Sequence, residues 1–209
     1  MIVAVDGPAA SGKGTLSRQI AAHFGLRYLD TGLTYRGVAH AMHQSGHGFD
    51  DVDAAVAAAN ALDFTMLGNM DLRSDEVGEG ASRIAVMPAL RKVLVERQRL
   101  FAQGAGKGAV LDGRDIGTVV CPDARVKLFV IASVEERARR RTHQLFGLVE
   151  GPQYDVLLKS LKARDERDMG RADSPLRPAA DAHTLDTTRL TIEEALERAI
   201  ALVNGAYLE

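Results

Sequence analysis

The chain has 209 residues, of which 46% are apolar and 26% are charged, and this composition is typical of a folded domain with one substantial core. A formal net charge of −2 argues against recruitment of nucleic acid or an anionic membrane by the field of the whole molecule, so any anion site must be a local group of arginines. No apolar run is long enough to span a bilayer, and residues 1–5 lack the basic segment of a signal peptide, which predicts a cytoplasmic protein.

The first residues of the chain predict a strand, a helix and a second strand. Residues 2–5 form a short apolar run of the kind that becomes a buried strand. A helix is expected over residues 15–24, because apolar side chains recur there every four positions and Gly25 follows as a stop signal. Residues 27–29 then predict a second short strand.

The second half of the chain continues the alternation of strands and helices. Three more short apolar runs are predicted as strands, namely residues 109–111, 126–131 and 184–185. A closing amphipathic helix is expected over residues 191–202, with Thr191 as its N-cap and Glu194 as the capping-box partner. Strands that alternate with helices predict an α/β fold with a five-stranded parallel sheet.

Two long stretches interrupt this alternation. Residues 33–103 are largely helical in pattern, and only residues 63–66 are a candidate strand. Residues 143–178 are rich in Arg and Asp but keep helical spacing, so a mobile flap is expected there rather than disordered filler. The core is thus expected to comprise about residues 1–32, 106–142 and 179–209, with insertions at about 33–105 and 143–178.

A phosphate-binding loop follows the first predicted strand. Its residues are Gly7, Pro8, Ala9, Ala10, Ser11, Gly12, Lys13, Gly14 and Thr15. Glycines let consecutive N–H groups turn toward a phosphate, the following helix offers its positive end, and Lys13 reaches the β- and γ-phosphates of a nucleotide. Thr15 is expected to supply a hydroxyl at the Mg²⁺ position. A chance glycine-rich turn is the alternative, but the required strand and helix flank the loop.

Such loops also serve GTPases and mechanical ATPases. A GTPase would carry an Asn/Thr-Lys-x-Asp motif that reads guanine, and the sequence contains none. An ATPase of the mechanical type normally has a longer chain and takes an arginine from a neighbouring subunit, whereas this chain carries many arginines of its own. The insertion of Gly14 between Lys13 and Thr15 is characteristic of nucleoside-monophosphate kinases, and a kinase is therefore the favoured interpretation.

Two segments are candidates for binding the acceptor. The first runs from Asp30 to Arg36 and offers hydroxyl, aromatic and guanidinium groups within one helical turn. The second follows the strand predicted at 109–111, where parallel sheets place functional residues. In it Asp112 can order Mg²⁺-bound water, Arg114 can bind a phosphate, and Asp115 can face the acceptor.

With these motifs in place, the chain resembles bacterial cytidylate kinases over nearly its full length. The matching segments are GPAASGKGT (7–15), DTGLTYR (30–36), LRSDEV (72–77), ERARRR (136–141), RDERDMGR (164–171) and DGRDIGTVVCPDA (112–124). The matching single residues are Ala81, Ser82, Arg91, Gln98 and Arg99. The resemblance implies a single kinase domain of the P-loop three-layer fold, in which residues 33–105 are the helical NMP-binding insertion and residues 143–178 the arginine-rich lid.

The resemblance also implies the reaction and the acceptor site. ATP would donate its γ-phosphoryl group to CMP, and to dCMP, by in-line transfer with Mg²⁺ and without a covalent intermediate. Arg36 and Arg114 would hold the CMP phosphate and Tyr35 would pack on the nucleotide. Thr31 stands where the family often has Ser and keeps the hydroxyl. Cytosine would be read by Ser82, Arg91 and Asp115, and the lid would contact sugar or phosphate through Arg164, Asp168 and Arg171.

Base chemistry makes this assignment reasonable. Cytosine carries an amino donor for Asp115 and acceptors for Arg91, whereas UMP would turn a carbonyl oxygen toward the Asp115 carboxylate. The CMP phosphate is largely dianionic at neutral pH, with a second pKa near ~6, so no general base is required.

The remaining arginines lie just before the second insertion or within it. Arg137, Arg141 and Arg167 are expected to contact ATP, whereas Arg139 is assigned to a solvated helix face. The spacing of Arg164, Arg167 and Arg171 predicts that their guanidinium groups share one helical face.

Other features are assigned to structure or left open. His40, His43 and His47 have helical spacing but lack further ligands for zinc, and the single Cys121 is expected to be a small buried residue. The segment of residues 63–77 is shorter than the corresponding segment of longer family members, which argues against a complete antiparallel subdomain there. A monomer is expected. The alternatives are a kinase of UMP, AMP or a shikimate-like acceptor, and a non-catalytic module that uses ATP as a switch.

Overall fold

The computed structural model describes residues 1–72, 74–104 and 106–208. Arg73, which belongs to the LRSDEV segment, lies outside the described residues. The chain divides into two compact units, and each is described by itself. Unit 1 comprises Met1–Leu29 and Gly104–Glu209, and unit 2 comprises Asp30–Gln103.

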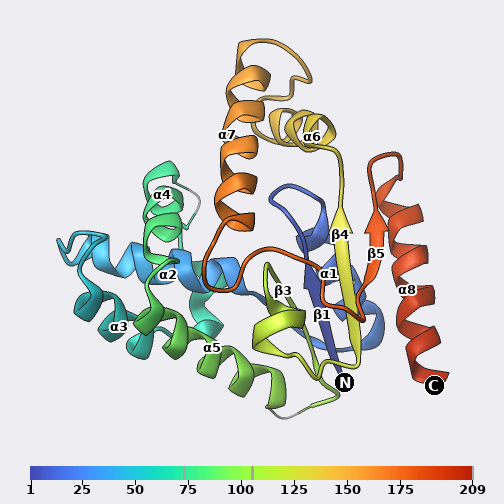
Figure 1. Ribbon diagram of the computed structural model, residues 1–209, viewed down its shortest axis with the longest axis horizontal. Helices are drawn as coiled ribbons and strands as arrows, with labels where there is room; N and C mark the ends of the chain where they lie inside the picture. Colours follow the sequence, from blue (N-terminus) through green and yellow to red (C-terminus); the bar gives the residue numbers. More distant parts are fainter. Residues whose placement is uncertain (73, 105, 209) are drawn as a thin grey trace. The chain divides into compact units, whose positions relative to one another are not determined.

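Unit 1 is built on a parallel sheet with the strand order β2-β3-β1-β4-β5. The strands are β1 (Ile2–Asp6), β2 (Arg27–Asp30), β3 (Ala109–Gly113), β4 (Val126–Ile131) and β5 (His183–Asp186). β1 pairs in parallel with β3 and β4, and β4 pairs in parallel with β5, as Figure 1 shows. The α/β fold with a five-stranded parallel sheet is therefore confirmed, although β1, β2, β3 and β5 extend beyond the predicted residues.

Two helices cover the sheet and complete its core. α1 (Lys13–Phe24) and α8 (Ile192–Leu208) pack against the strands and against each other. Their apolar faces bury Ile20 and Ala199 against strand residues such as Val3 and Leu128. Burying a side chain of this size contributes about 1.5–3 kcal/mol, which makes this cluster the main stabilising feature of unit 1.

The ends of these helices follow from local chemistry. α1 starts at Lys13, two residues earlier than predicted, and Gly25 ends it in the left-handed region at φ 64°. At the start of α8 the predicted capping box is confirmed. The Thr191 hydroxyl accepts from the Glu194 N–H at 3.1 Å, and the Glu194 carboxylate accepts from the Thr191 N–H at 2.8 Å.

Two further helices of unit 1 lie beyond the carboxyl ends of the strands. They are α6 (Val134–Phe146) and α7 (Pro152–Met169), drawn in yellow and orange in Figure 1. The two helices pack on each other, and a small apolar cluster joins Ala138 and Leu161 to Ala9 of the P-loop. The stretch predicted as a flap is therefore largely helical. A turn after Ile131 begins α6 with Ser133 as its N-cap.

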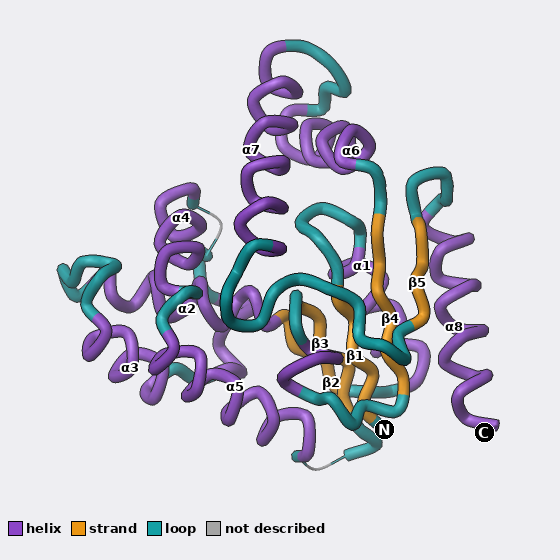
Figure 2. The backbone as a smooth tube through the Cα atoms, in the orientation of Figure 1, coloured by secondary structure: helices purple, strands orange, loops and turns teal. Residues whose placement is uncertain are grey.

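Unit 2 is helical. It contains α2 (Thr31–Gln44), α3 (Val52–Ala61), the 3₁₀ helix η1 (Phe64–Asn69), α4 (Asp75–Ile84) and α5 (Pro88–Gln103), as the purple segments of Figure 2 show. α2 packs against α3 and α4, and α3 packs against α5. Gly37 of α2 permits the close approach of the end of α3 and of η1, because a Cβ there would lie 2.9–3.0 Å from Leu62 and Leu67.

The candidate strand at residues 63–66 is wrong. Asp63 accepts hydrogen bonds from the Thr65 N–H at 2.9 Å and from the Thr65 hydroxyl, so it starts a turn that continues as η1. The described part of residues 63–77 contains no strand, which agrees with the shortness of this segment.

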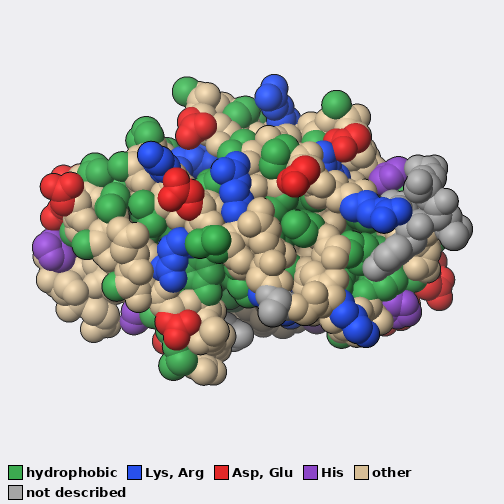
Figure 3. Space-filling model, turned by 90° about the horizontal axis from the view of Figure 1, so that it is seen from below, with side chains coloured by type: hydrophobic (Ala, Val, Ile, Leu, Met, Phe, Trp, Pro, Cys, Tyr) green, Lys and Arg blue, Asp and Glu red, His purple; other side chains and the backbone are tan. Residues whose placement is uncertain are grey.

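Charges of both signs are interspersed on the surface. On the face of the described residues that Figure 3 shows, basic and acidic side chains alternate among apolar and neutral ones. A search of the described helices found no segment with both the length and the apolar character that a membrane crossing requires.

Candidate active site

The P-loop joins β1 to α1 at the carboxyl end of the sheet. A Cβ on Gly7 would lie 2.1 Å from the carbonyl oxygen of Val130, so only glycine lets the loop pass β4. Ala10 and Gly12 adopt left-handed backbone angles, with φ of 60° and 88°. A left-handed alanine costs about 1 kcal/mol, a strain that is typical of functional loops. These turns form the backbone arrangement that can present N–H groups to a phosphate at the start of α1.

A threonine after β5 supports the P-loop from behind. The Thr187 hydroxyl lies 3.1 Å from the carbonyl oxygens of Ser11 and Ile131. Arg140 of α6 donates to the same hydroxyl at 3.1 Å and to the Thr187 carbonyl at 2.5 Å. One Arg140 nitrogen also lies 3.8 Å from the position that a Cβ of Gly12 would take. From the sequence, Arg140 is expected to contact phosphate as its neighbours Arg137 and Arg141 are, and that contact stays a prediction, since its guanidinium here binds Thr187.

Arg137 connects the P-loop to the lid helix. Its guanidinium donates to the Ala9 and Ala132 carbonyls at 3.1 and 2.9 Å. It also pairs with both carboxylate oxygens of Asp165 in α7, at 3.1 and 2.5 Å. The Arg137 side chain is 5% exposed and its partner 14% exposed, so the pair is largely dry. The predicted contact of Arg137 with ATP stays a prediction, since this conformation commits the guanidinium to the protein.

Asp112 lies beside the P-loop at the end of β3. It is buried, and it accepts a hydrogen bond of 2.6 Å from the Tyr28 hydroxyl. A Cβ on Gly14 would lie 3.5 Å from this carboxylate and 3.8 Å from the Tyr28 hydroxyl. These are ordinary contact distances, so the Asp112 carboxylate lies directly beside the first turn of α1. Tyr28 carried no sequence signal beyond its place near the end of a strand.

Arg114 and Arg171 bind one buried carboxylate. Arg114 Nε lies 2.8 Å from Asp168 Oδ2, and Arg171 Nη2 lies 2.6 Å from Asp168 Oδ1. Burial raises the pKa of the Asp168 carboxyl, but the charges of Arg114, Arg171 and Arg164 outweigh this effect and the pKa is lowered overall. The structure thus brings together four residues that the sequence proposed separately for the acceptor.

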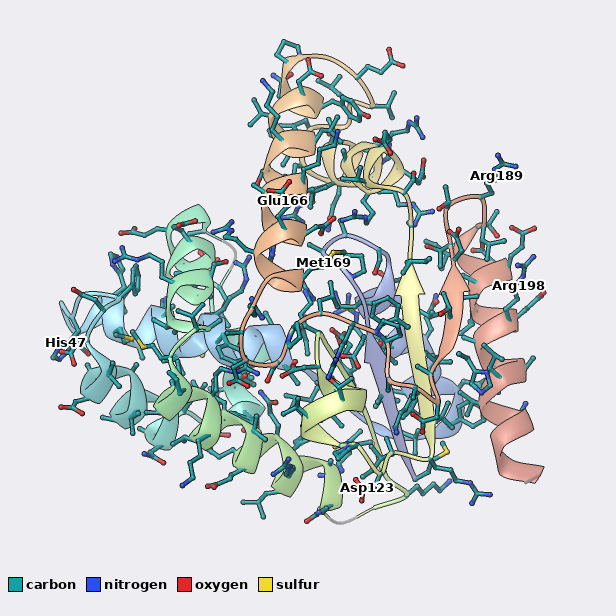
Figure 4. All side chains as sticks on the ribbon, viewed as in Figure 1. His47, Asp123, Glu166, Met169, Arg189 and Arg198 are labelled. Atoms are coloured by element: carbon teal, nitrogen blue, oxygen red, sulfur yellow. The ribbon has the colours of Figure 1, made fainter. Side chains whose placement is uncertain are left out.

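The predicted common helical face is wrong for Arg171. α7 ends at Met169, so Arg171 lies beyond the helix and reaches Asp168 from the following turn. Glu166 and Met169, labelled in Figure 4, are exposed on the last turns of α7. A helical repeat cannot place a residue that lies past the helix end.

The other arginines of the lid are more exposed. Arg139 pairs with Glu136 while half of its side chain stays in solvent, as predicted for a solvated face. Arg141 donates to Gln144 at 2.9 Å, and Arg167 is exposed on α7. The predicted contacts of Arg141 and Arg167 with ATP stay predictions.

Asp6, at the end of β1, holds the loop that follows β3. Its carboxylate accepts from the N–H groups of Ile116 and Gly117, both at 2.8 Å. These residues open the short π-helix η2 (Ile116–Val120) directly after Asp115. Burial raises the pKa of the Asp6 carboxyl to about 7, against the opposing effect of the two hydrogen bonds. Sequence reasoning missed Asp6 and read it only as the residue that follows a strand.

Unit 2 gathers its own set of predicted acceptor residues. Arg36 of α2 donates to the Leu72 carbonyl at 2.7 Å. Arg91 of α5 lies 3.3 Å from the hydroxyl of Tyr35 in α2. The Ser82 hydroxyl of α4 donates to the carbonyl of Gly78, and a Cβ on Gly78 would lie 3.0 Å from Arg36. Tyr35, Arg36, Ser82 and Arg91 thus come from three helices that pack within one unit.

The start of α2 positions the first of these residues. Asp30 is the N-cap and accepts from the Leu33 N–H at 3.3 Å. Thr31 follows at the first helical position and is buried. Thr34 is also buried and accepts a hydrogen bond of 3.1 Å from Gln98 of α5. These contacts fix the rotation of α2 within unit 2.

The histidines and the cysteine take structural roles. His43 pairs with Glu76 at 3.4 Å, and His47, labelled in Figure 4, pairs with Asp51 at 3.0 Å. Among the described residues no group of three or more His, Cys, Asp or Glu side chains could hold a metal by itself. Cys121 is buried, as predicted.

Comparison with known proteins gives a consistent result. Residues 3–205 match the family model described as cytidylate kinase. A Brucella suis protein named cytidylate kinase is 55% identical over 208 residues, which cover 100% of this chain and 94% of the relative. A Bartonella bacilliformis protein of the same name is 52% identical over 97% of this chain and 94% of its own.

Among solved structures, a protein from Thermus thermophilus is similar with a TM-score of 0.52 and 20% identity, over 98% of this chain and 96% of its own. That likeness shows the fold alone. The family model and the two relatives extend over nearly every residue, including the P-loop, the end of β3 and the lid arginines. The chain belongs to the cytidylate kinase family.

Proposed function

We propose that the chain transfers the γ-phosphoryl group of ATP to CMP and to dCMP, giving ADP and CDP or dCDP. The observation that carries this proposal is the P-loop between β1 and α1, with its left-handed turns at Ala10 and Gly12, in a chain of this family. The bond between the β-bridging oxygen and the γ-phosphorus breaks, and a phosphate oxygen of CMP forms the new bond to that phosphorus.

The donor site is assigned to the P-loop and the lid. Backbone N–H groups from Gly7 to Thr15 would contact the ATP phosphates, and Lys13 would reach the β- and γ-phosphates. Lys13 Nζ now lies 3.5 Å from the Pro8 carbonyl, a weak contact that phosphate oxygens can replace. Arg137, Arg141 and Arg167 are proposed to add positive charge as the lid closes.

The residues near the P-loop fit a magnesium ion. Mg²⁺ prefers oxygen ligands and keeps several waters, so a buried carboxylate beside the loop and a hydroxyl at the start of α1 are suitable donors. Asp112 meets the first condition, since its buried carboxylate lies beside Gly14 in the first turn of α1. We assign Thr15 and Asp112 to this ion, with Asp112 acting through water. When bound, Mg²⁺ neutralises charge on the transferred phosphoryl group.

The acceptor residues are proposed in two sets, one from each unit. From unit 2, Arg36 holds the CMP phosphate, Thr31 and Tyr35 contact the nucleotide, and Ser82 and Arg91 contact the base. From unit 1, Arg114, Arg164 and Arg171 hold phosphate or sugar with Asp168, and Asp115 accepts from the cytosine amino group. Asp168 now takes hydrogen bonds from two of these arginines, so it orients them while it lowers their net charge.

The chemistry requires alignment and charge neutralisation rather than a general base. A phosphate monoester with its second pKa near ~6 is mostly dianionic at neutral pH, so its oxygen is already a nucleophile. The task of the protein is to hold donor and acceptor in line and to place cations on the migrating charge. A closed lid would also exclude water, which would otherwise accept the phosphoryl group.

An acceptor panel tests the proposal. The full chain with Mg²⁺ and ATP is incubated separately with CMP, dCMP, UMP, AMP, shikimate or no acceptor, and ADP release is measured. We expect rapid release with CMP and dCMP, slower release with UMP, and little with the rest. If ADP release is faster with another acceptor, that compound replaces CMP as the proposed substrate. If the chain binds nucleotide but no acceptor increases ADP release, the ATP-switch module is favoured. Light scattering during the same preparation tests the proposed monomer.

Lys13→Ala serves as the catalytic control in this assay. We expect a loss of turnover of at least about a hundredfold with an unchanged circular dichroism spectrum, because one group that contacts the transferred charge is removed. Turnover close to that of the unchanged protein would refute the role of the P-loop lysine.

A further inference from the structure

The start of η2 is capped by a residue from another strand. Asp115 stands at the N-cap position, where an aspartate normally accepts from the N–H groups of the helix that follows. Its side chain makes no such hydrogen bond here. Asp6 of β1, more than a hundred positions away, accepts from the first two N–H groups of η2 instead.

Asp115, whose capping role Asp6 takes over, is the residue proposed to accept from the cytosine amino group. The backbone carbonyl of Asp115 accepts from Val119 and Val120 at 2.8 and 3.1 Å, so the Asp115 backbone is tied to η2. With η2 anchored by Asp6, the Asp115 carboxylate is not required for capping. A side chain carried by a backbone that is anchored in this way can meet a substrate in a fixed direction.

The surroundings of Asp6 leave it little freedom. The residue is 4% exposed, and a Cβ on Gly117 would lie 3.4 Å from its carboxylate. The same Cβ would lie 3.2 Å from the Lys127 side chain of β4, so Gly117 lets η2 approach both strands. A movement of Asp6 therefore displaces η2 and the residue before it.

We propose that Asp6 is a positioning residue for the reading of cytosine: by capping η2 in place of Asp115, it fixes the start of η2 and, with it, the backbone position from which the Asp115 carboxylate would meet the acceptor base. This inference rests on the proposed function, in which Asp115 reads the cytosine amino group. Asp6 touches neither substrate, so its effect appears in the choice between bases more than in phosphoryl transfer itself.

The first test uses Asp6→Asn. The amide keeps the shape of the side chain, but it replaces one of the two acceptor oxygens by an NH2 group, a donor that cannot accept from the N–H group it faces. The ratio of kcat/KM for CMP to kcat/KM for UMP is measured with saturating ATP. We expect this ratio to fall about threefold to thirtyfold, because a displacement of the reading group below 1 Å already costs much of its selectivity. An unchanged ratio in a folded variant overturns the proposal.

Two further variants separate this inference from its premise. Glu194→Ala removes a carboxylate that caps α8, so it matches the loss of a helix cap in unit 1 and should leave the ratio within about twofold. Asp115→Ala should lower the ratio by itself, and Asp6→Asn should add nothing to it in the double variant. If Asp115→Ala leaves the ratio unchanged, the assignment of Asp115 to the base fails; if it lowers the ratio while Asp6→Asn does not, only the present inference fails.

A second measurement needs no variant. Protonation of Asp6 blocks one acceptor oxygen, much as Asn does, and its pKa lies at about 7. Asp115 raises this pKa, Lys13 at the start of α1 lowers it, and the Lys127 side chain of β4 also lies next to Gly117. The ratio for CMP and UMP should therefore fall as pH decreases from 8.5 to 6, whereas the phosphates of the two acceptors titrate alike and cancel. A ratio that stays constant over this range overturns the proposal even if Asp6→Asn does not fold.

Discussion

At the scale of single residues, the end of β3 places three polar side chains in different surroundings. Asp112 is buried beside the P-loop with Tyr28, Arg114 turns to Asp168, and Asp115 precedes η2 without capping it. Only Asp112 belongs to the strand, whereas Arg114 and Asp115 follow its last residue, Gly113, so one short segment turns its side chains toward different surroundings. The proposed roles of these residues can be tested one at a time.

Asp115→Ala tests the reading of the base. We expect kcat/KM for CMP to fall about tenfold to a hundredfold, since a hydrogen bond to a charged group contributes about 1.5–3 kcal/mol. The value for UMP should fall less, because the carboxylate faces a carbonyl oxygen of that base. Steady-state kinetics with both acceptors measure the two losses, and equal losses would show that Asp115 does not read the base.

Tyr28→Phe tests the support of Asp112. Loss of the hydroxyl removes the hydrogen bond of 2.6 Å that orients the carboxylate, so Mg²⁺ affinity should fall by about tenfold with ATP bound. Mn²⁺ binding followed by electron paramagnetic resonance measures this affinity without turnover. A matched control is Tyr154→Phe, since Tyr154 packs in the apolar cluster of the lid helices. If both variants bind Mn²⁺ as the unchanged chain does, Tyr28 does not position Asp112.

At the scale of elements, α6 and α7 are joined to the P-loop by Arg137. Two carbonyls and one carboxylate from three segments converge on a single guanidinium. A planar group with five donors can satisfy all of them, which a lysine cannot do. This contact holds α6 and α7 against the P-loop in the present conformation.

Arg137→Ala should therefore destabilise the nucleotide-free protein. Removal of one partner leaves the Asp165 carboxylate largely buried, and such changes cost about 3–5 kcal/mol. Arg139→Ala on the same helix removes an exposed ion pair and should cost less than about 1 kcal/mol. Urea unfolding of both variants provides the comparison. Similar losses would mean that the Arg137 contacts contribute no more than a surface pair.

At the scale of the whole molecule, two buried carboxyl groups make stability depend on pH in opposite directions. The pKa of Asp6 is raised from 3.8 to about 7, so its favourable contribution is complete below about pH 4 and is lost as pH rises to about 7. The pKa of Asp168 is lowered, so its contribution is present above pH 3.8 and is lost as pH falls below that value. The two effects occupy separate ranges of pH.

The Asp6 effect can be isolated with Asp6→Asn. The shift corresponds to about 4 kcal/mol between pH 4 and pH 7, at about 1.4 kcal/mol per pH unit. We expect the free energy of unfolding of the unchanged chain to decrease by this amount as pH rises from 4 to 7. The free energy of unfolding of Asp6→Asn should not show this decrease. Denaturant unfolding at several pH values measures both curves. Parallel curves would show that Asp6 does not titrate in this range.

The sequence by itself determined the fold class, the P-loop, the capping box of α8 and the family. Each of these depends on residues that are close together in the chain, or on a pattern that repeats along one element. The candidate strand at 63–66 failed for the same reason, because a short apolar run does not reveal that Asp63 begins a turn.

Tertiary structure alone decided which distant residues share a task. Arg114 meets Asp168 across 54 positions, Tyr28 meets Asp112 across 84, and Asp6 meets Ile116 across 110. Burial, rather than sequence spacing, raises the pKa of Asp6, and the pairing of β1 with β3 brings it beside the loop that it caps. Contacts of this kind depend on how elements pack, and no local pattern of residues encodes them.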